Sequence, residues 1–143
     1  MSLCKGVLFA PIASKIHKTS FEKGWSEKEF SKLLALPTTR LWMTEEALLL
    51  CSEVADEMEI LTLCVKPESR RHYVAQDLLY ELFRYAKEKK VKRIFLEVAE
   101  NNIPAQKLYF KMGFLQTGKR EGYYVHKTDS IDALCLTKTF NSH

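Results

Sequence analysis

Apolar residues recur every three or four positions along four stretches of the chain, which is the pattern of helices with one buried face. The first stretch predicts a short helix over residues 10–20. The second predicted helix starts after Ser26, a good N-cap that can form a capping box with Glu29, and it ends at Pro37.

The third and fourth predicted helices carry clear end signals. The third has its buried stripe over residues 74–86 and finishes in lysines, where cations suit the negative end of the helix dipole. The fourth follows an asparagine cap at residues 101–102 and has Pro104 in its first turn. It ends before Gly113, a natural residue just past a helix.

Short apolar runs bounded by turn residues predict the strands. Residues 39–44 and 47–55 form a predicted pair. Residues 58–65 are apolar at nearly every position, which predicts a strand buried on both faces. A further strand is predicted at residues 94–98. The predicted strands that close the chain are 114–117, 123–126 and 131–139.

The order of these elements predicts the fold class. A strand at 58–65, a helix over 74–86 and a strand at 94–98 imply one parallel crossover within a sheet. We therefore expect an α+β fold: a mixed, mostly antiparallel sheet with a central parallel βαβ crossover. The 143 residues contain no Pro-, Gly- or Ser-rich linker, so residues 1–143 are expected to form a single domain.

Composition excludes some functions without naming one. The chain is 46% hydrophobic and 28% charged, which is ordinary for a globular protein, and we expect it in the cytoplasm with no membrane partner. A net charge of +4 fits a weak preference for anionic ligands such as phosphates. The four cysteines and four histidines are scattered, without the spacing of zinc ligands, so no metal is expected.

Two places have residues that suit chemistry. The first is the turn Arg70-Arg71-His72 before the third helix, because a helix start favours a phosphate or pyrophosphate. Its alternative interpretation is a solvated basic turn. The second is Glu97 at the end of an apolar strand with Tyr109 on the inner face of the following helix. They are suited to a general base and a general acid, or else to a rim ion pair and a core tyrosine.

A distinctive run follows the crossover: Leu96-Glu97-Val98-x-x-Asn101-Asn102, then Leu108-Tyr109 and Gly113-Phe114. Together with the buried strand, the basic turn and the amphipathic helix, it resembles the GNAT acetyltransferase superfamily over residues 25–140. Trp25-Ser26, residues 60–63 and Gly118-x-Arg120-x-x-Tyr123-Tyr124 are similar to its ribosomal-protein-alanine N-acetyltransferase branch. The resemblance implies a GNAT-type three-layer α/β/α domain that uses acetyl-CoA.

The resemblance also implies residue roles. Glu97 matches the general base of the family, Tyr109 its general acid and Asn102 an asparagine that contacts the cofactor. The matches to the strand that pairs with the pantetheine arm and to the pyrophosphate loop are Leu63, Cys64, Val65, Arg70, Arg71, His72, Tyr73, Val74, Ala75 and Gln76. The residues that match the border of the acceptor peptide are Arg120, Tyr123 and Tyr124.

Tyr73 departs from the family pattern, which has glycine at this position so that the backbone can approach the phosphates. With a negative φ, the ring swings outward and cofactor binding is expected to survive. With a positive φ, a strain of about 1–3 kcal/mol is expected. The N-terminus is also short, so the first strand of the family is expected to be abbreviated or missing.

The resemblance implies a reaction in which acetyl-CoA lies between residues 60–65 and 93–98. A backbone N–H near Val65 would stabilise the oxyanion, Glu97 would take a proton from the acceptor, and Tyr109 would protonate the thiolate. The implied acceptor is the N-terminal alanine of a small-subunit ribosomal protein. Its α-amino group, with a pKa of about 7.7–8.0, needs less help from a base than a lysine with a pKa of about 10.4.

Three alternatives stay open at this point. The acceptor could be a lysine or a small amine, or the chain could be a non-catalytic member of the family. The third is a ribosome- or RNA-binding module with Tyr123 and Tyr124 as stacking groups, although we expect no direct nucleic-acid contact. Its basic residues would be Lys87, Lys89, Lys90, Lys92 and Arg93.

Overall fold

One mixed sheet runs through the protein. The computed structural model describes residues 3–4, 6–21, 23–70, 73–125 and 130–140. Among these, seven strands lie in the order β1-β2-β3-β4-β5-β7-β6, and only β4 and β5 pair in parallel. They are β1 (Leu3–Cys4), β2 (Thr39–Met43), β3 (Ala47–Val54), β4 (Glu57–Val65), β5 (Arg93–Ala99), β6 (Leu115–Val125) and β7 (Ser130–Thr139). The predicted mostly antiparallel sheet with a central parallel crossover is confirmed.

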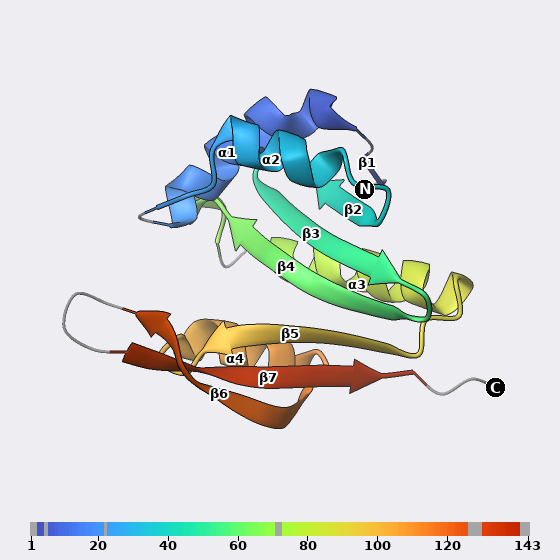
Figure 1. Ribbon diagram of the computed structural model, residues 1–143, viewed down its shortest axis with the longest axis vertical. Helices are drawn as coiled ribbons and strands as arrows, with labels where there is room; N and C mark the ends of the chain where they lie inside the picture. Colours follow the sequence, from blue (N-terminus) through green and yellow to red (C-terminus); the bar gives the residue numbers. More distant parts are fainter. Residues whose placement is uncertain (1–2, 5, 22, 71–72, 126–129, 141–143) are drawn as a thin grey trace.

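Helices cover both faces of this sheet (Figure 1). The helices α1 (Ala10–Ser20) and α2 (Glu27–Leu34) pack on one face, around Phe30, Leu41 and Leu50. On the other face, α3 (Val74–Glu88) and α4 (Ile103–Lys111) pack around a larger cluster that includes Leu82, Ile94 and Phe114. The expected three-layer α/β/α arrangement is therefore present. Two single-turn 3-10 helices, η1 (Val7–Phe9) and η2 (Pro67–Ser69), complete the described elements.

The strand β4 is covered on both faces, as predicted, but unevenly. Buried residues alternate with half-buried ones, and residues of both faces join the clusters under the helices. Leu61 is the extra residue of a bulge, because Leu50 pairs with Thr62 and Cys51 pairs with Ile60. Beyond the bulge, the buried residues of β4 point to the opposite face of the sheet. Before the bulge, Met58 and Ile60 pack under α3 and α4. After it, Cys64 packs under α1 and α2.

Local hydrogen bonds mark the start of α2 and the end of α4 where the sequence predicts them, whereas α2 ends at Leu34, before the predicted Pro37. Ser26 Oγ accepts a bond of 3.1 Å from the Glu29 backbone N–H at the start of α2. After α4, Gly113 has a φ of 96° and the Phe114 N–H donates to the Tyr109 carbonyl, a Schellman ending. A Cβ on Gly113 would lie 2.5 Å from Lys138 Nζ, the end of a flexible side chain that can move aside, so the positive φ is what favours glycine here.

The two strands predicted at residues 114–117 and 123–126 are one strand, β6. Its pairing with β7 shifts register at Gln116/Gly118 and again at Arg120/Tyr124. Bulges at these shifts keep the strand continuous between the two predicted segments. Gly122 has a φ of 63°, and its N–H donates a 2.7 Å hydrogen bond to Asp132 Oδ1. His126, in the second predicted strand, lies outside the described residues.

Candidate active site

The parallel strands β4 and β5 separate along their length. They pair only from Glu57–Arg93 to Glu59–Phe95. Among the described residues, those of β4 from Ile60 onward pair with β3 alone, and the backbones diverge from that point (Figure 1). The β4 edge that faces β5 therefore carries backbone groups outside the ladder, which an extended ligand can bind.

Glu97 lies on β5 beside this separation. Its neighbours Leu96 and Val98 are buried under α3 and α4, so the Glu97 side chain points to the opposite face. Arg120 Nη1 lies 3.2 Å from both carboxylate oxygens of Glu97. The Glu97 side chain is 26% exposed, so the carboxylate is reachable as well as charge-paired.

Tyr109 is buried on the inner face of α4, where its ring packs edge-on against Phe114 with centroids 5.5 Å apart. It belongs to the cluster under α3 and α4, whereas Glu97 points to the other face. The predicted acid and base thus lie on opposite sides of the sheet. The separation between β4 and β5 is the place where a thioester could meet both.

The residues Leu63, Cys64 and Val65 form the end of β4. Leu63 and Val65 pack towards α3, while Cys64 is buried towards α1. Burial raises the pKa of Cys64 to about 12, so its thiol is protonated at neutral pH and is not a nucleophile. Alternate residues of a strand direct their backbone groups to the same edge, so part of this stretch can offer its backbone to a ligand, and the Val65 carbonyl already accepts from Ser20 Oγ and Arg70 Nε.

The structure describes only part of the predicted pyrophosphate site. Val74, Ala75 and Gln76 form the first turn of α3, and none of the described side chains caps its start. Arg70 bends back towards the sheet: its Nε donates to the Val65 carbonyl at 3.1 Å and its Nη2 to Ser20 Oγ at 3.2 Å. Arg71 and His72 lie outside the described residues.

Tyr73 stands immediately before α3 with a φ of 61° and a ψ of 15°, the left-handed region. The positive-φ case therefore applies, and we expect strain at this residue. The side chain is nonetheless turned outward, 67% exposed, with Lys111 Nζ 5.8 Å from the ring centroid.

Replacing Tyr73 with glycine is expected to raise the free energy of unfolding by about 1 kcal/mol, because glycine adopts a positive φ without strain. Urea unfolding checks this. Tyr73→Ala is the matched control, since it removes the ring but keeps the Cβ and should not gain stability. Equal stabilities of the glycine and alanine variants would contradict a strained backbone.

Asn102 is the N-cap of α4, and its Oδ1 accepts a 3.2 Å hydrogen bond from the Ala105 N–H. This oxygen therefore caps the N-terminus of α4. The predicted contact of Asn102 with a cofactor stays a prediction.

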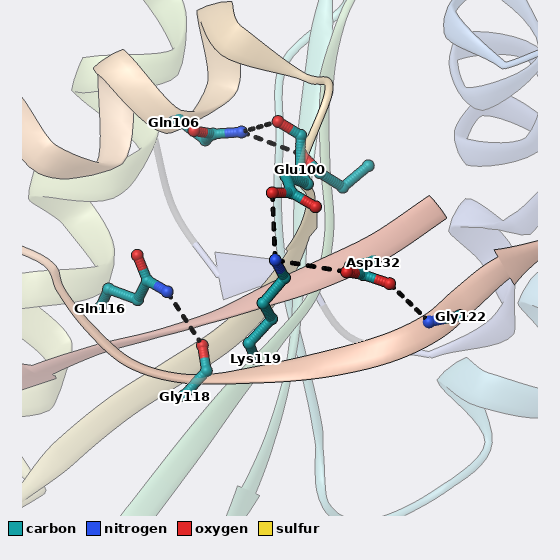
Figure 2. A network of polar contacts seen from close by, with 8 residues as sticks. Glu100, Gln106, Gln116, Gly118, Lys119, Gly122 and Asp132 are labelled. Carbon is teal, nitrogen blue, oxygen red and sulfur yellow. Dashed lines mark hydrogen bonds and ion pairs between the residues drawn. The ribbon is translucent and has the colours of Figure 1, made fainter. Parts of the chain in front are cut away.

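A polar network holds β6 beside the end of β5 (Figure 2). Lys119 Nζ lies 3.2 Å from a Glu100 oxygen and 3.3 Å from an Asp132 oxygen. Gln106 Nε2 donates to the Glu100 carbonyl at 2.7 Å, which connects α4 to the same network. This network holds β6 in place. Arg120, one of the three residues predicted to border the acceptor, lies on β6 beside Glu97. Tyr123 and Tyr124 lie on β6, but their side chains are outside the described part of the chain.

Sequence reasoning missed two residues near this site. Glu59 is a carboxylate beside the apolar residues of β4, a signal similar to the one that singled out Glu97, although Glu57 precedes it on the same strand. His17 on α1 is 3% exposed: the Trp25 N–H donates to its Nδ1 at 2.9 Å, so its Nε2 donates to Thr62 Oγ1 at 3.2 Å. No sequence spacing connects His17 with Thr62, which lies 45 residues away.

Two features are absent from the part of the chain that the structure describes. No three His, Cys, Asp or Glu side chains gather there as a group that could hold a metal ion. No helix in the described ranges is long and apolar enough to cross a membrane.

Known proteins are similar to this chain in sequence or in fold. A Bacillus subtilis (strain 168) protein, provisionally named a ribosomal protein bS18-alanine N-acetyltransferase, is 32% identical over 133 residues, covering 89% of this chain and 87% of its own. The crystal structure of the Escherichia coli ribosomal-protein-S18-alanine N-acetyltransferase superposes with a TM-score of 0.88 at 22% identity, covering 99% and 95% of the two chains. Arabidopsis thaliana NAA60 in complex with acetyl-CoA superposes with a TM-score of 0.82 at 18% identity, covering 99% and 100%.

The family itself is matched over most of the site. Residues 12–114 match the acetyltransferase (GNAT) family, a range that includes the separated strands, the uncapped start of α3, Glu97 and Tyr109. With the fold and this match together, the chain belongs to the GNAT family of acetyltransferases.

Proposed function

We propose that this acetyltransferase moves the acetyl group of acetyl-CoA to the N-terminal alanine α-amino group of a small-subunit ribosomal protein, in the cytoplasm, with residues 1–143 as one domain. The observation that carries the proposal is the separation of β4 and β5 beyond Glu59–Phe95, with Glu97 beside it. The name of the B. subtilis relative supports this choice of acceptor.

The residues present fit acetyl-CoA in two respects. The β4 edge at Leu63–Val65 offers backbone groups to an extended pantetheine arm. The start of α3 has no side-chain cap, so the N–H groups of its first turn can bind the pyrophosphate.

The side chains divide the proton transfers. Glu97 takes a proton from the acceptor ammonium, and the neutral amine then attacks the thioester carbon. The new N–C bond forms, the C–S bond breaks, and Tyr109 supplies a proton to the departing sulfur. The attacking nitrogen then loses its second proton, which restores the Tyr109 hydroxyl. A backbone N–H near Val65 stabilises the negative charge that develops on the carbonyl oxygen.

Thermal unfolding with acetyl-CoA, followed by mass spectrometry of a peptide that begins with alanine, tests the proposal. Cofactor at 100 times its Kd is expected to add about 2.7 kcal/mol to the stability of the folded state. The peptide should gain one acetyl group at its N-terminus.

Two controls locate the acetyl group. A peptide with a blocked N-terminus and an internal lysine should stay unmodified, and its acetylation would identify a lysine acceptor instead. No change in unfolding temperature at millimolar acetyl-CoA would contradict the proposal.

A further inference from the structure

Glu59 lies where β4 and β5 separate. It forms the last register pair of the two strands, opposite Phe95, and Glu97 follows two residues later on β5. Because its neighbours Met58 and Ile60 pack under α3 and α4, the Glu59 side chain points to the other face of the sheet. The two carboxylates therefore share a face, one on each side of the separation.

Arg120 is the positive charge of this cluster. Its Nη1 binds both oxygens of Glu97 across β7, since Glu97 pairs with Cys135 on β7 and Arg120 pairs with Ala133 there. Burial raises the pKa of Glu59 above its usual range, the charge of Glu97 raises it further, and Arg120 opposes the rise. The three groups thus act on one another electrostatically.

The Figure 2 network explains why Arg120 points to this face. Lys119 is bound by Glu100 and Asp132 on the side of α4. Successive residues of a strand point to opposite faces, so Arg120 is directed to the face of Glu59 and Glu97.

We propose that Glu59 is a second acceptor-binding residue, which holds the acceptor ammonium together with Glu97 while Arg120 balances the charge of the pair. This inference rests on the proposed function and names what attracts its acceptor. Glu97 and Arg120 together are neutral, so Glu59 supplies the negative charge that draws a cationic amine to the site. Glu59 also keeps the amine in place when Glu97 takes its proton.

The variant Glu59→Gln tests this inference because it keeps the shape of the side chain and removes its charge. For a peptide with an N-terminal alanine, we expect KM to rise about tenfold at neutral pH while kcat stays within about threefold. The same peptide with an N-terminal aminooxyacetyl group is uncharged at that pH. Its inhibition constant as a competitor should be equal for the wild type and the variant.

Glu57→Gln is the matched control. Glu57 lies on the same strand and the same face, but it pairs with Arg93 at 2.8 Å, away from Arg120. This variant should keep the wild-type KM. An unchanged KM in Glu59→Gln would overturn the inference, and so would an equal loss of affinity for the charged and uncharged peptides.

Equilibrium binding of the alanine peptide to the three proteins separates the two proposals. If the wild type binds the peptide without acetylating it, the proposed function fails while the affinities still test Glu59. If the wild type acetylates the peptide and Glu59→Gln binds it equally well, the proposed function stands and the role of Glu59 fails.

Discussion

Replacing Glu97 with glutamine is expected to lower kcat for an alanine peptide by about 10²- to 10⁴-fold, the usual contribution of a general base. The amide has the size of the carboxylate but cannot take the proton. The loss should shrink as the pH rises, because more of the acceptor is then already deprotonated. Steady-state kinetics from pH 6.5 to pH 9.5 would measure both effects.

Tyr109→Phe tests the other proton transfer in the same assay, with a loss of similar size expected from the missing donor. Tyr80→Phe is its control, because Tyr80 is an exposed tyrosine on α3. If Glu97→Gln and Tyr109→Phe both keep wild-type turnover, the assignment of the base and the acid is wrong.

Acidification from pH 7.5 to pH 5 is expected to cost about 2 kcal/mol of folding stability through His17 alone. Burial lowers the pKa of His17 to about 4, against a small opposing effect of Glu29. The unfolded chain binds a proton near pH 6.5, whereas the folded protein does not. The stabilisation is therefore fully present above about pH 6.5 and is lost as the pH falls towards 4.

Urea unfolding at the two pH values measures this effect. The variant His17→Gln is the comparison, because a glutamine amide can donate to Thr62 and accept from Trp25 without titrating. It should be less stable at pH 7.5, since His17 stacks on Trp25 with centroids 4.6 Å apart, but its stability should change less between the two pH values. Equal changes in both proteins would contradict a neutral His17.

The predictions for Glu97 and His17 concern neighbouring parts of one site. His17 connects α1 to Thr62 on β4, next to the bulge at Leu61. Its hydrogen bond to the Trp25 N–H also fixes the segment between α1 and α2. Protonation of His17 should therefore loosen the helices beside the acceptor face before it affects Glu97.

The amino-acid sequence by itself determined the local structure. The start of α2 at Ser26 and the end of α4 at Gly113 follow from hydrogen bonds within a few residues, so they are legible in the chain. Glu97 stood out because a carboxylate in an apolar strand needs a reason. The parallel crossover was predictable because a strand, a helix and a strand follow one another.

Only the tertiary structure decided how distant residues meet. Residues 114–117 and 123–126 were predicted as separate strands, but pairing with β7 keeps β6 continuous through two register shifts. Arg120 reaches Glu97 because β7 lies between their strands, an order that local patterns do not encode. The proposed role of Glu59 also depends on the tertiary structure, because β4 separates from β5 at that residue. Strand separation depends on contacts between residues far apart in the chain.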